Sequence, residues 1–427
     1  MSYSDVRVIG LSKIVCKVPA PISYSTGKRV LCYAEAWGQG GIETFLMELF
    51  RRLQGNGVSF SLYSCWDWND SFDDELAKLG IDRYTVFSGY KPGQLKRLCD
   101  GSKGFAELAN AMSPDAVYIN TMNGMGFLYS EVAMKCCVPV RVVHSHNSAF
   151  GSGQAAAKAV MHAFGKTVLS GSATACLACS SDAGRYLFGN RPFEVVNNGI
   201  DTERFRFDAA ARAEIRESFD IPQNAFLFGN VGRIAEVKNP FFQIRVFAEI
   251  LKREPNSYYL MVGEGDLRPQ VEELVDELAI REKVIMPGYL PDPAPVYSAL
   301  DCFLMPSLFE GLAIVGIEAQ CSGCTIVCSE ALPSEAHVTD VEASLPLSAG
   351  EPAWADRAVE MVRMSIDRDI YAALVRSAGF DADHCASIVR KHLLDRVSCD
   401  YSSSDSAFAC IGFRRDPLCS QHESIYR

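Results

Sequence analysis

The chain has 427 residues, 48% of them hydrophobic, which is enough apolar material for two or three domains with cores of their own. Its net charge of −11 argues against a general nucleic-acid binder, because such proteins need a positive field to displace counterions from phosphates. Its 16 cysteines lie mostly in apolar runs of a long chain, unlike the dense cysteines of a secreted disulfide scaffold. We expect reduced core cysteines and no nucleic-acid partner.

The sequence also bears on where the protein works. No run of about 18 apolar residues is present, so we expect no membrane span. Lys13 and Lys17 interrupt the apolar pieces of the N-terminal segment, which lacks a signal-peptide core. We expect a cytoplasmic protein, and peripheral contact with the inner face of a membrane stays open.

In chain order, short apolar runs alternate with stretches of helical period. The strands predicted in the first half are 29–34, 58–64, 83–87, 116–120, 140–144 and 173–180, with a helix over 43–53. Those predicted in the second half are 226–231, 257–262, 283–286, 302–305 and 325–328, with helices over 240–253, 267–278 and 313–321. Strands that are apolar on both faces and separated by helices form parallel sheets covered on both sides. The predicted fold class is therefore α/β, with two doubly wound, Rossmann-like sheets.

The turn formers Asn197-Asn198-Gly199 mark the boundary between the two halves. The predicted units are an N-terminal extension (1–28), a first domain (29–198), a second domain (199–380), a helix returning toward the first domain (381–397) and a serine-rich, poorly ordered tail (398–427). Two such domains face each other across a cleft, and ligands of open α/β sheets bind outside the carboxyl ends of the strands. Motifs that directly follow strands are therefore the candidates for function.

Two motifs follow strands of the first domain. Gly38-Gln39-Gly40-Gly41 precedes the first helix, where glycines allow close backbone approach and free N–H groups favour an anion. A plain turn is the alternative, and Glu43 at the last position departs from the dinucleotide fingerprint. His144-Ser145-His146 lies at the end of the strand 140–144. We expect His146 to contact a ligand, with a structural or metal-binding role as the alternatives.

A loop of the second domain carries two cations. Gly232 ends the strand 226–231, Arg233 and Lys238 follow, and Pro240 opens a helix. Beside a helix N-terminus, such a pair forms a diphosphate clamp, in which Arg binds bidentately and Lys acts as a point charge. Two solvated surface cations are the alternative.

Two glutamates frame the start of the helix predicted over 313–321. Glu310 precedes the helix and can accept two sugar hydroxyls, while the amides that follow it point toward an anion. Glu318 lies inside the helix among apolar residues and requires a partner, which a ribose diol would supply. An exposed helix face is the alternative. The predicted donor-binding residues of this loop are Gly311, Leu312, Ala313 and Ile314.

Together, the Gly232-Arg233/Lys238 loop, the Glu310-x7-Glu318 spacing and the glycine loop at Gly40-Gly41 resemble the retaining glycosyltransferases of family 4, which have the GT-B fold. The resemblance spans about residues 29–395. The segment Arg-Val-Val-His-Ser-His-Asn at 141–147 resembles the subgroup that builds capsular and exopolysaccharide repeat units. Ala313 departs from the Pro or Phe that relatives often carry near the glutamate, which leaves the substrate open.

The resemblance implies a role for each matching residue. Arg233 and Lys238 would neutralise the donor diphosphate. Glu310 would hold the donor sugar and Glu318 the ribose, while His146 would approach the transferred sugar. The remaining implied contacts are with the nucleotide base for Gly288 and Tyr289, and with the acceptor or phosphate side for Gly40 and Gly41.

The resemblance also implies the chemistry. A hexosyl or N-acetylhexosaminyl group would pass from a UDP- or GDP-sugar to a saccharide or lipid-linked acceptor, with retention and without a metal cofactor, in surface polysaccharide biosynthesis. Two alternatives stay open: a sugar-nucleotide epimerase of the same fold, and a nucleotide-sugar-binding subunit without catalysis.

Overall fold

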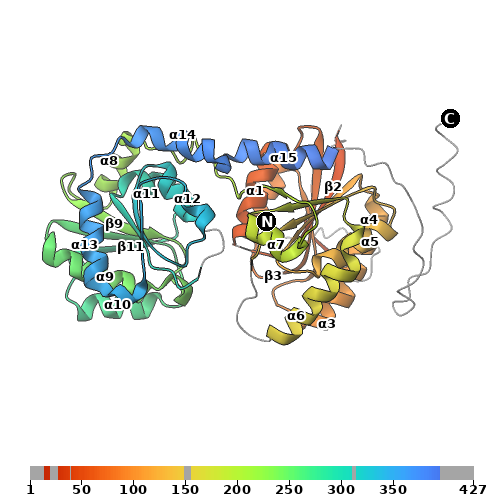
Figure 1. Ribbon diagram of the computed structural model, residues 1–427, viewed down its shortest axis with the longest axis horizontal. Coiled ribbons are helices and arrows are strands. Elements are labelled where there is room, and N and C mark those ends of the chain that lie inside the picture. Colours follow the sequence, from red (N-terminus) through yellow and green to blue (C-terminus); the bar gives the residue numbers. More distant parts are fainter. Residues whose placement is uncertain (1–13, 20–26, 39, 149–154, 310–313, 395–427) are drawn as a thin grey trace, which may run out of the picture.

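The computed structural model describes residues 14–19, 27–38, 40–148, 155–309 and 314–394. Figure 1 shows two lobes side by side, each built around a sheet. Two helices near the end of the described chain, α14 (Tyr371–Val375) and α15 (Ala382–Leu394), run along one side of both lobes. Among the described residues, no helix is long and apolar enough to cross a membrane.

The first lobe holds an eight-stranded sheet in the order β1-β4-β3-β2-β5-β6-β7-β8. Neighbouring strands are parallel, except that β1 runs antiparallel to β4. The strands are β1 (Val15–Val18), β2 (Lys28–Trp37), β3 (Val58–Asp67), β4 (Asp82–Phe87), β5 (Ala116–Thr121), β6 (Val140–Ser145), β7 (Ala175–Ala178) and β8 (Glu194–Val195). The order reverses between β2 and β5, which is where a doubly wound sheet opens a crevice.

The second lobe holds a six-stranded, wholly parallel sheet in the order β11-β10-β9-β12-β13-β14. Its strands are β9 (Phe226–Val231), β10 (Ser257–Val262), β11 (Val284–Gly288), β12 (Cys302–Met305), β13 (Thr325–Ser329) and β14 (Glu342–Leu345). Here the order reverses between β9 and β12.

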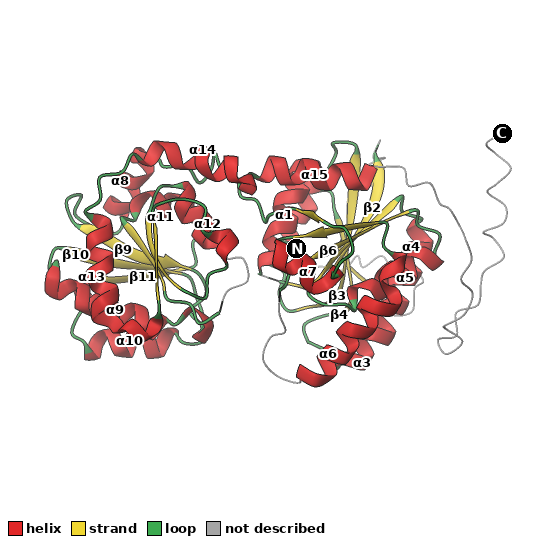
Figure 2. Ribbon diagram, in the orientation of Figure 1, coloured by secondary structure: helices red, strands yellow, loops and turns green. Residues whose placement is uncertain are grey.

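Helices surround both sheets (Figure 2). Those of the first lobe are α1 (Gly41–Leu53), α2 (Asp73–Leu79), α3 (Gln94–Lys96), α4 (Ser102–Met112), α5 (Gly126–Lys135), α6 (Ala155–Phe164) and α7 (Ser181–Phe188). Those of the second lobe are α8 (Ala209–Ser218), α9 (Pro240–Arg253), α10 (Arg268–Glu277), α11 (Ala294–Ala299), α12 (Ile314–Cys321) and α13 (Gly350–Val362). The α/β class with two parallel-sheet domains, predicted from the sequence, is confirmed.

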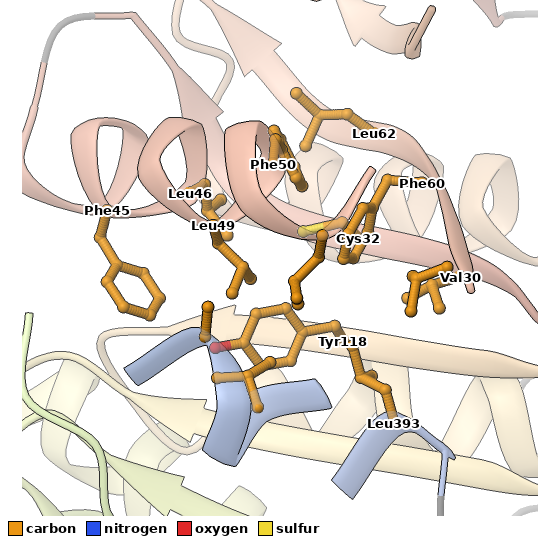
Figure 3. Packing of buried hydrophobic residues seen from close by; sticks show 14 of the residues in the cluster. Val30, Cys32, Phe45, Leu46, Leu49, Phe50, Phe60, Leu62, Tyr118 and Leu393 are labelled. Carbon is orange, nitrogen blue, oxygen red and sulfur yellow. The ribbon is translucent and has the colours of Figure 1, made fainter. Parts of the chain in front are cut away.

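The packing of α1 shows why its sequence forms a helix in this place. Phe45, Leu46, Leu49 and Phe50 recur at helical spacing and are all buried against the sheet (Figure 3). Leu393 of α15 is buried in the same cluster. The last described helix is thus part of the first lobe's core.

The bounds of the predicted units stay predictions, but one observation bears on the N-terminal extension. The strand β1 lies inside the segment 1–28 that was set apart as an extension, and it forms an edge of the first sheet. The sequence also contains two Cys-x-x-Cys pairs, Cys176/Cys179 and Cys321/Cys324, and all four are buried free thiols, in line with the expected reduced core cysteines. Burial raises the pKa of the Cys324 thiol to about 12, so it stays protonated at neutral pH.

Candidate active site

Two loops meet where the strand order of the second sheet reverses. The loop after β9 carries Arg233 and Lys238, and the loop after β12 leads to α12. Because β9 and β12 are neighbours, both loops leave the same edge of the sheet. The Leu308 N–H donates to the carbonyl of Val237 at 2.8 Å, which ties the two loops together directly.

The loop after β9 begins with a positive φ angle, which a glycine at this position allows. Gly232 has φ +154°, and its N–H donates to the carbonyl of Val262 at 2.9 Å. A side-chain carbon at Gly232 would stand 3.9 Å from Cε of Lys238, so the lysine stem lies beside the glycine. Lys238 is half-buried and Arg233 is exposed. The two predicted cations therefore belong to one turn at the carboxyl edge of the sheet.

A buried hydrogen-bond chain holds the lysine end of this turn. The amide of Gln243 on α9 donates to the backbone carbonyl of Lys238 at 2.7 Å, and the Tyr259 hydroxyl on β10 donates to the Gln243 carbonyl oxygen at 2.8 Å. Gln243 and Tyr259 are both buried. Neither residue was predicted, because nothing in the spacing of a helix residue and a strand residue shows that they touch.

Glu318 is 8% exposed and already has a partner within the protein. The hydroxyl of Tyr297 on α11 donates to its Oε2 at 2.5 Å. Burial raises the pKa of Glu318 from 4.5 to about 7, against the opposing effect of the Tyr297 hydrogen bond. The need for a partner, inferred from the apolar helix, is met by Tyr297, and the predicted ribose contact stays a prediction.

The rest of the predicted glutamate loop is placed only in part. Glu310, Gly311, Leu312 and Ala313 lie outside the described residues, and their predicted roles stay predictions. Ile314 begins α12.

The predicted base-contacting residues lie at the end of β11, which β10 separates from β9. Gly288 ends β11 with φ +87°, and its carbonyl accepts from the Gly263 N–H at 2.9 Å. The positive φ favours glycine here, and a side-chain carbon would stand 2.5 Å from Oε1 of Glu264, which would have to shift. Tyr289 follows it and is 62% exposed. Glu264 was not predicted as part of the site; its carboxylate accepts from Arg268 at 2.6 Å.

In the first lobe, His146 is a neutral hydrogen-bonding group. Its Nε2 lies 2.9 Å from Oδ1 of Asn120, whose amide donates to the carbonyl of Tyr33. Nε2 therefore carries the proton and Nδ1 is an acceptor, for which no described residue supplies a donor. Burial lowers the pKa of His146 to about 3, so the ring is uncharged at neutral pH. The ring centroid of His144 lies 4.1 Å away.

The glycine loop differs from a simple anion site. Gly40 caps α1, and a side-chain carbon there would stand 2.6 Å from Oε2 of Glu43. Burial raises the pKa of Glu43 above its ordinary value, while a hydrogen bond to its own backbone opposes this shift. The carboxyl group of Glu43 therefore lies at the start of α1, where the sequence predicted a bound anion. Gly41 has open space around its Cα.

The two halves of the site face each other. Figure 1 shows α1 and α12 on the sides of the lobes that are turned toward one another. Burial is the largest cause of the raised pKa of Glu318 on α12, and the negative charge of Glu48 on α1 raises this pKa further. Residues from both lobes therefore share one region, as expected for a site between two domains.

Two family models cover most of this architecture. The model described as Glycosyltransferase Family 4 matches residues 39–204, and that described as Glycosyl transferases group 1 matches residues 211–343. The chain is a family 4 glycosyltransferase. The family predicted from Arg233, Lys238, Glu310 and Glu318 is thereby confirmed.

Individual relatives agree with this assignment. The glycosyltransferase EpsF of Bacillus subtilis is 29% identical over 346 residues, which cover 78% of the enzyme and 87% of that protein. A UDP-Gal:alpha-D-GlcNAc-diphosphoundecaprenol alpha-1,3-galactosyltransferase of Escherichia coli is 28% identical over 139 residues, 32% of the enzyme and 36% of that protein. Among solved structures, Anabaena Alr3699/HepE in complex with UDP and glucose has 17% identity and a TM-score of 0.66, covering 86% of the enzyme and 99% of that chain. This likeness confirms the GT-B fold.

Proposed function

We propose that the enzyme transfers a hexosyl or N-acetylhexosaminyl group from a UDP- or GDP-sugar to a saccharide or lipid-linked acceptor, with retention, in the synthesis of a surface polysaccharide. The observation that carries the proposal is the hydrogen bond between Leu308 and Val237, which joins a loop with two cations to a loop that leads to a buried carboxylate. A nucleotide-sugar has both kinds of complementary group, because its diphosphate is anionic and its sugars present hydroxyls.

The charge that develops on the leaving diphosphate would be stabilised by Arg233 and Lys238. Cations fixed in advance at the place where negative charge develops are the largest catalytic effect expected for such a reaction. The turn that bears them precedes α9, whose N-terminal end adds a favourable dipole. These groups do the work that a metal ion would otherwise perform, and we propose that none is needed.

The carboxylates and the histidine would hold the sugars. Glu310 would accept hydrogen bonds from hydroxyls of the donor sugar. Glu318 would accept them from the ribose hydroxyls through one carboxylate oxygen, while the Tyr297 hydroxyl donates to the other. The acceptor atom Nδ1 of His146 suits a hydroxyl of the transferred sugar, because a neutral imidazole can receive its hydrogen bond. Departure and attack on the same face of the sugar would then give retention.

The comparisons support the substrate classes. The name of the relative from Escherichia coli specifies a UDP-Gal donor and an acceptor sugar on diphosphoundecaprenol. Anabaena Alr3699/HepE was solved in complex with UDP and glucose. Both agree with a nucleotide-sugar donor, and the first agrees with a lipid-linked acceptor.

The test begins with the thermal shift that UDP and GDP produce, followed by incubation with a panel of UDP- and GDP-sugars. We expect nucleoside diphosphate release that depends on a lipid-linked acceptor, that persists in EDTA, and that gives a product with the donor's anomeric configuration. A free epimer without nucleotide release would identify an epimerase. Tight nucleotide binding without turnover on any acceptor would identify a non-catalytic subunit.

A further inference from the structure

Two aromatic side chains stand exposed where adjacent strands of the first sheet end. Trp68 directly follows β3 and is 49% exposed, and Tyr90 comes three residues after β4 and is 54% exposed. Each packs edge-on against a buried aromatic ring of its own strand: Trp66 at 5.4 Å between centroids, and Phe87 at 5.8 Å. Two exposed rings at the ends of neighbouring strands form a candidate binding surface, because water solvates apolar surface poorly and a ligand that covers it is favoured.

The two rings are held in place by a charged network beneath them. Asp67 is buried, and it accepts from the Gly89 N–H at 2.7 Å and from Arg83 at 3.0 Å. One carboxylate therefore fastens the segment after β4 to the end of β3. The fully buried Arg83 also donates to Asp70 at 2.9 Å and to Asp73 at 2.5 Å, which fixes the loop that carries Trp68. These buried, charge-assisted hydrogen bonds hold the loops after β3 and β4 in one conformation.

The exposed tryptophan lies against the glycine loop of the site. A side-chain carbon at Gly38 would coincide with the Trp68 indole, standing 1.2 Å from Nε1. The backbone N–H of Trp68 also donates to the carbonyl of Trp37 at 3.1 Å. Gly38 is therefore required to make room for the indole, which explains one glycine of a motif that was interpreted only as a phosphate or acceptor loop. The ring extends the site from the glycine loop across the ends of β3 and β4.

The surroundings of the rings suit a sugar better than a purely apolar ligand. Asn69 and the exposed Asp70 follow Trp68 in the chain, and the ammonium group of Lys91 lies 5.4 Å from the Trp66 ring centroid. A pyranose ring presents C–H groups on its faces and hydroxyls at its edge. The C–H groups carry partial positive charge and favour the negative face of an aromatic ring, while neighbouring polar side chains bind the hydroxyls.

We infer that Trp68 and Tyr90 form an aromatic platform on which a pyranose of the acceptor stacks, so that the acceptor is a saccharide or carries one. The inference rests on the proposed function, since it concerns the acceptor side of the same site. The platform lies on the first lobe, away from the loops after β9 and β12 that are proposed to hold the donor. Donor and acceptor binding can therefore be tested separately.

The experiment uses the full chain saturated with UDP or GDP, whichever of the two shifts its Tm. This complex is titrated with free disaccharides: maltose, cellobiose, lactose and N,N′-diacetylchitobiose. Saturation-transfer NMR and tryptophan fluorescence report binding. We expect at least one disaccharide to bind, and Trp68→Ala to raise its Kd about tenfold or more, as for loss of a large aromatic contact. Tyr90→Ala should weaken binding less, and Trp68→Phe should retain most of it.

Two further variants make the test specific. Gly38→Ala keeps the tryptophan in the sequence but displaces its ring, and it should weaken disaccharide binding as Trp68→Ala does. Leu374→Ala removes a comparably exposed apolar side chain, 42% exposed, from the other lobe and should change nothing.

Several outcomes would overturn the inference. One is UDP or GDP binding to the wild type without binding of any disaccharide, and another is a Kd that Trp68→Ala and Gly38→Ala leave unchanged. A third is loss of binding to phosphatidylglycerol vesicles in Trp68→Ala with disaccharide binding intact, which would assign the rings to a lipid surface. If neither UDP nor GDP produces a thermal shift in the wild type, the proposed function fails, and that result is distinct from the other three.

Discussion

Arg233 and Lys238 share one turn but are held differently: Arg233 is exposed, while the backbone of Lys238 is fixed by Gln243. If both meet the leaving diphosphate, Lys238→Ala and Arg233→Ala should each reduce the rate of transfer by roughly 10²-fold or more, as for loss of one transition-state contact. The measurement is the initial rate of nucleoside diphosphate release with acceptor present. Arg245→Ala is the control, because this half-exposed cation lies on α9 and contacts Glu351. If all three variants transfer at the rate of the wild type, the turn is not part of the active site.

Glu318 predicts an unusual dependence of stability on pH. Its pKa is raised from 4.5 to about 7, so between these values the folded protein holds a proton that the unfolded chain has released. The free energy of unfolding therefore falls as pH rises through this window, by about 3 kcal/mol at roughly 1.4 kcal/mol per pKa unit. Glu318→Gln cannot ionise and escapes this loss. Without nucleotide, its Tm should exceed that of the wild type at about pH 8 and match it at about pH 4.

The control for this prediction is Glu360→Gln, which changes an exposed carboxylate paired with Arg357. Its Tm should follow that of the wild type across the same range. A wild type and a Glu318→Gln variant whose Tm values change in parallel with pH would show that Glu318 is not held in a protonated state. If Glu318 contacts the ribose, Glu318→Gln should bind UDP more weakly than the wild type. The same variant would then be more stable without nucleotide at about pH 8 and a weaker binder of UDP.

At the scale of elements, the turn after β9 depends on a helix and a strand behind it. Tyr259→Phe removes the hydroxyl that donates to Gln243 and leaves the buried amide oxygen unsatisfied, which costs about 1–3 kcal/mol of stability. Because Gln243 holds the Lys238 carbonyl, we expect the Kd for UDP to rise severalfold as well. Tyr371→Phe is a matched control: it also removes the hydroxyl of a buried tyrosine in this lobe, one that donates to Asp340 at 2.9 Å. It should lower Tm without changing the Kd. If both variants bind UDP like the wild type, the hydrogen-bond chain does not position the turn.

The elements that the sequence predicted well are those with a strong local pattern. The strand Phe226–Val231 and the helix Pro240–Arg253 have the predicted bounds, because one is a short apolar run and the other has Pro at its start and helical period throughout. The strands β1, β8 and β14 were not predicted. Each is four residues or fewer, and Glu342–Leu345 carries polar side chains, so only pairing with a neighbouring strand makes it a strand.

The candidate site divides in the same way. Gly232, Arg233 and Lys238 are recognisable because glycine and cations between a strand and a helix have few structural uses. Tyr297 and Trp68 were not found, because the first lies 21 residues from Glu318 and the second contacts Gly38 across two strands. Such contacts depend on tertiary packing, which a single sequence does not show.

At the scale of the whole molecule, the described part of the chain crosses between the lobes twice, and Arg52 at the end of α1 contacts both crossings. It pairs with Asp201 at 3.4 Å and with Asp383 at 2.7 Å. The second crossing delivers α15 to the core of the first lobe, where Val389 and Leu393 are fully buried. A helix from the end of the described chain thus packs into the core of the N-terminal lobe and stabilises it.

This arrangement predicts that a change near residue 393 destabilises the first lobe. Leu393→Ala should cost about 2–5 kcal/mol there, because it leaves a cavity under the sheet. Urea unfolding followed by tryptophan fluorescence is suitable, since Trp37, Trp66 and Trp68 report on the first lobe and Trp354 on the second. Saturating UDP should raise the midpoint of the second lobe alone, which identifies the two transitions. Lys391→Ala, an exposed change on the same helix, should shift neither. If Leu393→Ala lowers only the midpoint that UDP raises, α15 stabilises the donor lobe instead, and the core shared between α1 and α15 is not the one that holds the first lobe together.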